Sequence, residues 1–179
     1  MKKKMNSSVK SIIVLVAICL FIAVAMAAVN LVTAPKIAEA TAAAEQEALA
    51  AVMPENGGFE KLDIDGLPEC VRDIYRDLDG EGYVTLLEVK GYDASNPLSV
   101  AVGFTSEGNI TECYVISASG ETSGIGSKVT EESFLSQFSN KNKELDGVDA
   151  ISGATISSSS LIDAVRQSFE ALEKAGEVS

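Results

Sequence analysis

The segment 149–155 reads Asp-Ala-Ile-Ser-Gly-Ala-Thr and has the residue types best suited to chemistry in this chain. Its small residues predict a tight turn, and its threonine hydroxyl comes directly before a serine run and an amphipathic helical pattern. The N-terminus of a helix offers unpaired N–H groups and the positive end of the helix dipole, so it binds phosphate well. On the residues alone, a serine-rich loop that leads into a helix cap is the simpler interpretation, and a phosphate site is the other.

The pattern Asp-x-x-Ser/Thr-Gly-Ala-Thr resembles the flavinylation motif of FMN-binding domains. That family includes the G subunit of Rnf-type electron-transport complexes and the C subunit of the sodium-translocating NADH:quinone oxidoreductase. In the family, the last threonine of the motif carries FMN through a phosphoester bond. The resemblance implies that Thr155 is the covalent attachment site, and that the cofactor-binding motif is completed by Asp149, Ser152, Gly153 and Ala154.

A second motif, at 121–128, reads Glu-Thr-Ser-Gly-Ile-Gly-Ser-Lys. Its glycines allow the backbone to approach a ligand closely. The loop resembles the Glu-Thr-Pro-Gly-Leu-Gly loop of Rnf G subunits, although Ser123 replaces the usual proline and Gly120 stands where the family often has a nearby histidine. The resemblance implies further cofactor-binding residues, which are Glu121, Thr122, Gly124 and Gly126. We expect Glu121 to be the charged group nearest the redox centre.

The N-terminal region has the features of a membrane anchor. Residues 1–10 carry four lysines, and an apolar run then extends from Ile12 to Val29. About 20 apolar residues cross the hydrocarbon core of a bilayer, and a basic flank favours a cytoplasmic N-terminus. We therefore predict a cytoplasmic tail (1–10), a transmembrane anchor (11–33), a linker helix (34–56) and an FMN-binding domain (57–179) on the outer face of the cell membrane.

Two other interpretations of this region stay open. The Ala-Met-Ala sequence at 25–27 fits a signal-peptide cleavage site. The apolar run is longer than a usual signal core, so we favour a retained anchor. A lipoprotein is disfavoured because Ile18 precedes Cys19 where a lipid-modification site has a small residue.

Composition excludes several function classes. The net charge is −12 over 179 residues, which argues against binding to nucleic acid or to an anionic membrane surface. The absence of histidine excludes Ser-His-Asp and Cys-His catalysis within this chain. The three cysteines form no CxxC pair, so a metal or iron–sulfur site is not predicted. Cys70 and Cys113 could form a disulfide in an oxidising exterior, but we favour two unpaired thiols.

Local patterns place the first elements. A helical pattern extends from Pro35 to about Val52, with Pro35 in its first turn and Pro54 beyond its end. Alternating apolar residues predict strands at 83–89, 98–104 and 110–117, and the last two form a hairpin. The mixed, acidic segment 61–82 gives no clear prediction.

The C-terminal third reads as helical. Phe134 and Phe138 indicate a short helix that packs into the core. An apolar stripe predicts a final helix over about 158–174, with a capping box formed by Ser160 and Asp163 and an end near Gly176.

Together these patterns predict an α+β protein: one transmembrane helix, then one FMN-binding domain with an antiparallel sheet and flanking helices. The resemblance implies a covalent FMN carrier in an Rnf-type, ion-translocating ferredoxin:NAD oxidoreductase, which is not catalytic alone. Its expected partners are the other membrane subunits and a flavin transferase that attaches FMN. Two alternatives stay open: a stand-alone membrane-anchored flavoprotein for extracellular electron transfer, and a non-redox surface or pilin-like protein.

Overall fold

The computed structural model describes residues 7–80 and 82–176 of the chain. It divides into two compact units, residues 1–43 and 44–179. The first unit contains most of helix α1, and the second contains the last turns of that helix, a five-stranded sheet and the remaining helices. An antiparallel sheet with flanking helices confirms the predicted α+β class.

Helix α1 (Ser7–Val52) includes the predicted membrane anchor. Among the described residues, one helix is long and apolar enough to cross a membrane, and its most apolar stretch is fully exposed. Lys2, Lys3 and Lys4, which belong to the predicted basic tail, lie outside the described residues. Pro35 lies inside α1 rather than in a first turn, so that prediction was wrong. The helix continues through the proline, whose lost amide hydrogen bond long membrane helices tolerate.

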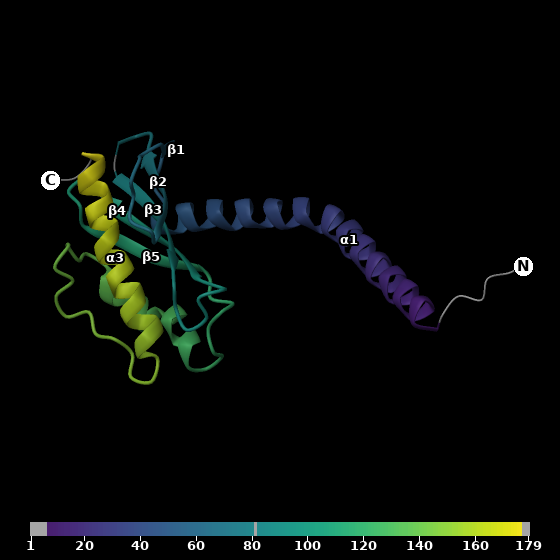
Figure 1. Cartoon of the computed structure of the whole chain (residues 1–179). Helices are drawn as coiled ribbons and strands as arrows, with labels where there is room; N and C mark the ends of the chain where they lie inside the picture. Colours follow the sequence, from purple (N-terminus) through teal and green to yellow (C-terminus); the bar gives the residue numbers. More distant parts are fainter. Residues whose placement is uncertain (1–6, 81, 177–179) are drawn as a thin grey trace, which may run out of the picture. The chain divides into compact units, whose positions relative to one another are not determined.

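The second unit is built on a sheet whose strands follow the chain order and pair only with antiparallel neighbours (Figure 1). The strands are β1 (Phe59–Leu62), β2 (Val71–Asp77), β3 (Gly82–Val89), β4 (Leu98–Thr105) and β5 (Ile110–Ser117). The last three confirm the predicted strands and their hairpin. Strand β2 lies in the segment 61–82, which gave no clear prediction, and β1 overlaps the start of that segment.

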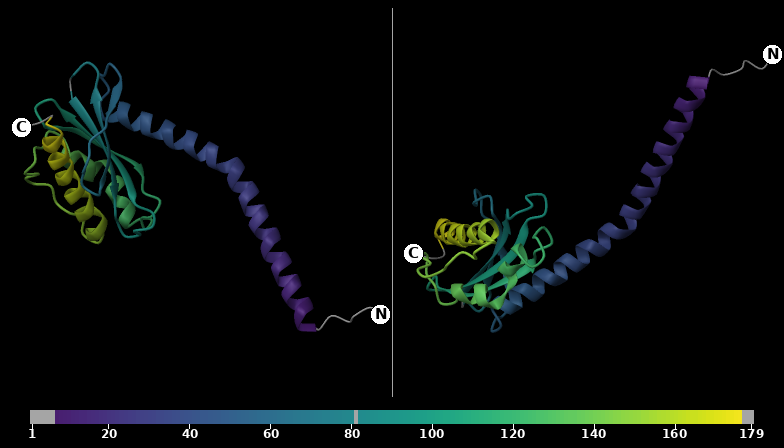
Figure 2. Two further views of the ribbon diagram at one scale, coloured as in Figure 1. Left: turned by 45° about the horizontal axis from the view of Figure 1, so that its top comes forward. Right: turned by 90° about the horizontal axis from the view of Figure 1, so that it is seen from below.

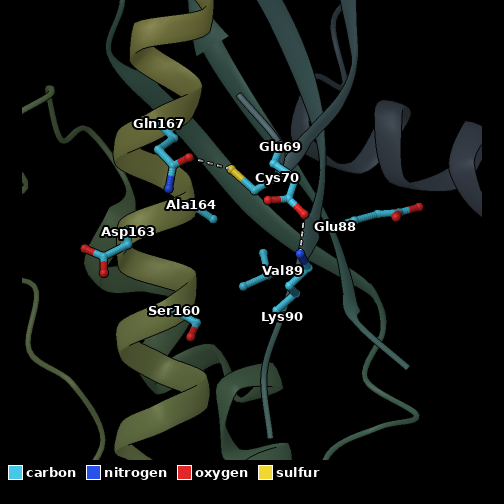
Figure 3. Close-up of a pocket in the computed structure, with 9 residues that line it drawn as sticks. All are labelled: Glu69, Cys70, Glu88, Val89, Lys90, Ser160, Asp163, Ala164 and Gln167. Atoms are coloured by element: carbon cyan, nitrogen blue, oxygen red, sulfur yellow. Dashed lines mark hydrogen bonds and ion pairs between the residues drawn. The ribbon is translucent and has the colours of Figure 1, made fainter. Parts of the chain in front are cut away.

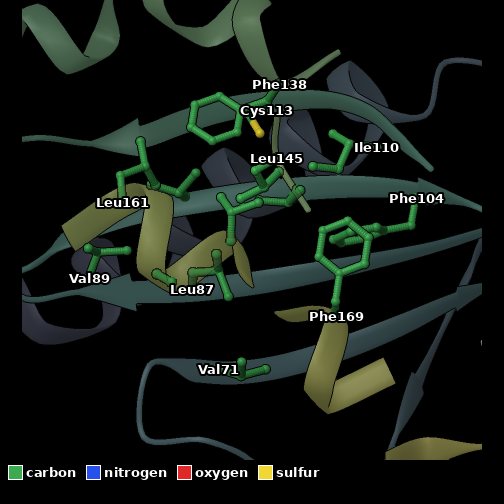
Figure 4. Close-up of a cluster of buried hydrophobic side chains, with 14 of the residues drawn as sticks. Val71, Leu87, Val89, Phe104, Ile110, Cys113, Phe138, Leu145, Leu161 and Phe169 are labelled. Atoms are coloured by element: carbon green, nitrogen blue, oxygen red, sulfur yellow. The ribbon is translucent and has the colours of Figure 1, made fainter. Parts of the chain in front are cut away.

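Helix α3 (Thr155–Ala175) covers one face of this sheet (Figure 2). Its apolar stripe enters the main core, where the ring of Phe169 meets the ring of Phe104 edge-on at 5.0 Å (Figure 4). Gly176 caps its C-terminus, as predicted. The helix begins at Thr155, three residues before the expected start, and Ala154 is its N-cap. The predicted capping box at Ser160 and Asp163 was therefore wrong, because both residues lie inside the helix.

The last turns of α1 cover the opposite face of the sheet. Successive side chains of a strand point to opposite faces of the sheet. The positions that face away from α3 contact the last turns of α1. The second core cluster joins α1 residues to β3 and β4, and consists of Ala48, Leu49, Val52, Met53, Val84, Leu86 and Ala101. An ion pair of 2.6 Å between Arg72 and Glu45 also connects β2 to the helix. The sheet is thus buried on both sides.

Three short helices connect β5 to the loop before α3: η1 (Gly126–Thr130), α2 (Glu132–Leu135) and η2 (Ser136–Phe138). Phe134 and Phe138 are buried and pack edge-on, with ring centroids 5.4 Å apart. This confirms the predicted short helix and its place in the core. The same connection brings residues just before η1 close to the start of α3, where the candidate site lies.

Candidate functional site

The segment 149–155 forms a tight turn that enters α3. The Ala154 N–H donates to the carbonyl of Ile151 at 3.0 Å, and Gly153 has a φ of +87°. Glycine adopts this left-handed conformation without the strain that a side chain brings. The buried Ser158 hydroxyl accepts a hydrogen bond from the Ile151 N–H at 3.0 Å and donates to the Ala154 carbonyl at 2.9 Å. These bonds fix the turn against the first turn of the helix.

Thr155 presents the accessible hydroxyl of that first helical turn. Its side chain is exposed, and no hydrogen bond of its hydroxyl is found within residues 7–80 and 82–176. Ser157 and Ser158, by contrast, are 2% and 0% exposed. The Ser157 hydroxyl donates to Glu121, and the Ser158 hydroxyl donates to Ala154. An incoming group therefore meets Thr155 rather than these two serines.

The N-terminus of α3 is electrostatically suited to a phosphate. Its N-cap, Ala154, makes no side-chain capping hydrogen bond. The first amide groups of a helix have no intrahelical acceptor, and the helix dipole adds a partial positive charge at that end. A phosphate on Thr155 would lie beside these donors, which is the usual geometry of anion binding at helix N-termini.

A cavity of about 460 Å³ opens beside Thr155. Three segments line it, and the lining residues are Tyr92, Glu121, Thr122, Ile125, Gly126, Gly153, Ala154, Thr155, Ile156 and Ser157. Large apolar side chains at its border are unusually exposed, with Tyr92 at 69%, Ile125 at 52% and Ile156 at 60%. Cofactor sites are concave and mostly apolar, with a few placed polar groups. This cavity has that character, and its volume lies in the range of several hundred Å³ typical of such sites.

The structure brings together six of the nine residues that the sequence singled out. The two motifs, which are about 30 residues apart in the chain, meet at the cavity through Glu121, Thr122, Gly126, Gly153, Ala154 and Thr155. Asp149, Ser152 and Gly124 do not line it. Asp149 and Ser152 are exposed, and the Asp149 N–H donates to Gln137. These three residues therefore belong to the motifs without forming part of the cavity wall.

Sequence reasoning missed four residues of the cavity: Tyr92, Ile125, Ile156 and Ser157. Tyr92 follows Gly91 in the connection between β3 and β4, far from both motifs in the chain. A Gly-Tyr pair before a strand was the available signal for it. The two isoleucines sit inside or beside the motifs, but only the fold shows that their side chains are exposed around a cavity.

A second cavity, of about 240 Å³, lies between α3 and the end of β3 (Figure 3). Four of its polar residues are engaged with one another: Lys90 pairs with Glu69, and the Cys70 thiol donates to Gln167 at 3.4 Å. Burial raises the pKa of the Cys70 thiol, which disfavours the reactive thiolate. Cys70 and Cys113 are both free, which confirms the favoured prediction of unpaired thiols. In the described part of the chain, no group of three or more potential ligands is arranged to hold a metal ion.

Comparison with known proteins agrees with the geometry around Thr155. Residues 91–170 match the model of a family described as FMN-binding domain. The G subunit of an ion-translocating oxidoreductase complex from Methanosarcina acetivorans is 28% identical over 140 residues, which cover 70% of this chain and 73% of that protein. The G subunit of the proton-translocating ferredoxin:NAD(+) oxidoreductase complex from Clostridium ljungdahlii is 27% identical over 165 residues, which cover 85% of this chain and 84% of that protein.

Proposed function

We propose that this chain belongs to the FMN-binding domain family, whose model matches residues 91–170, and that it is the FMN-carrying G subunit of a membrane-bound, ion-translocating ferredoxin:NAD oxidoreductase complex. The similarity to two G subunits covers most of each protein, which supports this role over that of an isolated flavoprotein. The chain transfers electrons between its neighbours in the complex and converts no substrate by itself.

The observation that carries the proposal is the accessible Thr155 hydroxyl at the border of the 460 Å³ cavity. FMN, when bound, supplies reversible one- and two-electron transfer. The first amide groups of α3 would hold its phosphate, because they lack a side-chain cap. The exposed side chains of Tyr92, Ile125 and Ile156 would contact the flat ring system and shield it from water.

We infer that the attachment is covalent, through a phosphoester at the Thr155 side-chain oxygen. A flavin transferase presents FAD to the folded domain. The Thr155 oxygen bonds to the FMN phosphorus, the bond between the two phosphates of FAD breaks, AMP leaves, and the hydroxyl proton passes to solvent. Ser157 is 2% exposed and donates to Glu121, so its oxygen cannot compete for the phosphorus.

The anchor and the charge distribution support an outer location for the flavin domain. Residues 1–10, before the apolar run, carry four lysines, whereas the 20 residues after it carry one basic residue, Lys36. Basic flanks stay in the cytoplasm. A single-pass chain with this asymmetry has its N-terminus inside and its second unit outside, next to the other membrane subunits of the complex.

The attachment is tested by Thr155→Val, with Ser159→Ala as the control in the same helix. Each full chain is produced together with a flavin transferase and separated on a denaturing gel. We expect flavin fluorescence in the wild-type and Ser159→Ala bands and none in the Thr155→Val band, because a phosphoester survives denaturation. Fluorescence of Thr155→Val would place the attachment on a serine, and a dark wild-type band would refute covalent attachment.

Topology and partnership are tested on cells that express the tagged chain. External protease on intact spheroplasts should digest residues 34–179, and mild-detergent purification should retain other polytopic subunits. Protection of this segment from protease would contradict the outer location. If the cells contain the neighbouring subunits at their normal levels and the tagged chain is still purified without them, membership of a complex is contradicted.

A further inference from the structure

The carboxylate of Glu121 joins the three segments that line the flavin cavity. Its Oε1 accepts a hydrogen bond from the N–H of Tyr92 at 3.2 Å, and its Oε2 accepts one from the hydroxyl of Ser157 at 2.5 Å. Tyr92 lies between β3 and β4, Glu121 lies between β5 and η1, and Ser157 lies in the first turn of α3. These partners are 29 and 36 residues away from Glu121 in the chain.

Two glycines leave the space that this carboxylate occupies. A Cβ at Gly91 would lie 1.9 Å from Oε1 of Glu121, and a Cβ at Gly126 would lie 2.2 Å from its Oε2. Both distances are far below van der Waals contact. The carboxylate therefore sits in a slot between two backbone segments that approach closely only because neither has a side chain.

We propose that Glu121 is a positioning residue that keeps the flavin cavity assembled by tying the Tyr92 segment and the start of α3 to the loop before η1. The proposal rests on the proposed function, because the cavity is the one assigned to FMN. Hydrogen bonds to an ionised carboxylate are about twice as strong as neutral ones, so one side chain can hold two otherwise unconnected segments. Tyr92 forms one wall of the cavity, and α3 carries the attachment hydroxyl.

Replacements of Glu121 keep its two hydrogen bonds to different extents. Glutamine keeps one oxygen that accepts from the Tyr92 N–H, and its amide group can donate to the Ser157 oxygen, whose hydroxyl is able to turn. Alanine removes both contacts and leaves the slot empty. A positioning role therefore predicts rescue by Glu121→Gln but not by Glu121→Ala. An effect of the negative charge itself would show equal loss in both variants.

The first test measures hydrogen exchange at the Tyr92 amide in the full chain, purified in detergent and made without a flavin transferase. Glu121→Ala should speed this exchange about tenfold, since a hydrogen bond to a charged group is worth about that factor or more. Glu121→Gln and the exposed control Glu107→Gln should exchange like the wild type. An unchanged rate in Glu121→Ala would overturn the proposal.

A second variant keeps the test decisive where Glu121→Ala fails to fold. Gly126→Ala retains every atom of Glu121 but places a methyl carbon 2.2 Å from Oε2. The rigid carboxylate must then shift as a whole and carry Oε1 away from the Tyr92 N–H, so the Tyr92 amide should again exchange faster than in the wild type. Wild-type exchange in Gly126→Ala would show that the carboxylate does not hold Tyr92, and would overturn the proposal.

The functional test repeats these variants with a flavin transferase present. Attached flavin should fall several-fold in Glu121→Ala and be restored in Glu121→Gln, and the same loss in both variants would overturn positioning. A wild-type chain without attached flavin would refute the proposed covalent function alone, because the exchange experiment uses protein without flavin and still decides whether Glu121 holds the cavity.

Discussion

Gly153 allows a sharp test of the motif geometry, because its backbone conformation can be perturbed without a steric clash. It has a φ of +87° and lies two residues before Thr155. A Cβ built on it meets no atom within 4 Å. The left-handed region costs an ordinary L-residue about 1–2 kcal/mol. The cost of Gly153→Ala is therefore a backbone cost alone.

We expect Gly153→Ala to lower the free energy of unfolding by about 1–2 kcal/mol. For a unit of the size of residues 44–179, this corresponds to a Tm lower by about 3–10 °C. Gly80 is the matched control, since its φ is +78° and its Cβ would also meet nothing within 4 Å. Gly80→Ala should lose the same stability, as measured by near-ultraviolet circular dichroism of the tyrosines during thermal unfolding.

The two glycine variants should differ in flavin attachment. Gly153→Ala distorts the turn that presents Thr155, whereas Gly80 lies between β2 and β3 and does not line the cavity. Gly153→Asn should recover part of both losses, because asparagine enters the left-handed region more readily than alanine. An unchanged Tm in Gly153→Ala would refute the left-handed turn. Equal losses of attachment in both alanine variants would show that stability, and not the turn, limits attachment.

Three further outcomes follow from the buried groups. Ser158→Ala should cost about 1–3 kcal/mol in urea unfolding, because the Ile151 N–H loses its acceptor; a neutral result would mean that water replaces the hydroxyl. Burial alone would raise the pKa of Asp73, but hydrogen bonds from two basic side chains hold that pKa below its usual value. The stabilisation by this carboxylate is present above its unfolded pKa of about 4 and is lost as the pH falls further. In Asp73→Asn the free energy of unfolding should therefore decrease less steeply at acidic pH than in the wild type. The same acidic decrease in both proteins would contradict this. Burial raises the pKa of the Cys113 thiol, so iodoacetamide should label it only after unfolding, and labelling of Cys113 in the native chain, located by peptide mass mapping, would contradict its burial.

The sequence predicted the elements whose signals are local. Strands β3, β4 and β5 alternate apolar and polar residues or form continuous apolar runs, and turn residues separate the last two. The pattern of β2 is different, because its buried positions are Val71, Ile74 and Asp77, three residues apart. A register shift between Val71 and Asp73 breaks the alternation that would have revealed this strand.

Both errors at helix starts have the same physical cause. The pattern around Ser160 predicts a cap, because serine side chains commonly accept from the first amides of a helix. In this chain Ser160 lies inside a helix that begins at Thr155, and the neighbouring Ser158 hydroxyl donates back to the Ala154 carbonyl. Pro35 was read as a first-turn residue, but the apolar run before it is already helical. Each residue type fits both positions, and the point at which the helix has already begun decides between them.

The sequence predicted the two motifs of the candidate site but not the other residues that line the cavity. The two glycine-containing loops were recognisable from their residue types. In the Tyr92 segment, however, the partner of Glu121 is a backbone N–H, which every residue except proline has. Such a contact cannot be predicted from the residue types. The glycine at position 91 is the nearest signal, and its reason becomes visible only when the carboxylate of Glu121 occupies the space beside it.

Packing against the sheet explains why the last turns of α1 belong to the second unit. Leu49 and Val52 are buried against Val84 and Leu86, on the face of the sheet that α3 leaves open. Burial of each such side chain contributes about 1.5–3 kcal/mol, so this contact is comparable to a large part of the stability of an average domain. The last turns of α1 are therefore part of the second unit. They form one of the two helical layers that bury the sheet, and the sheet in turn positions the Tyr92 segment and α3 at the cavity.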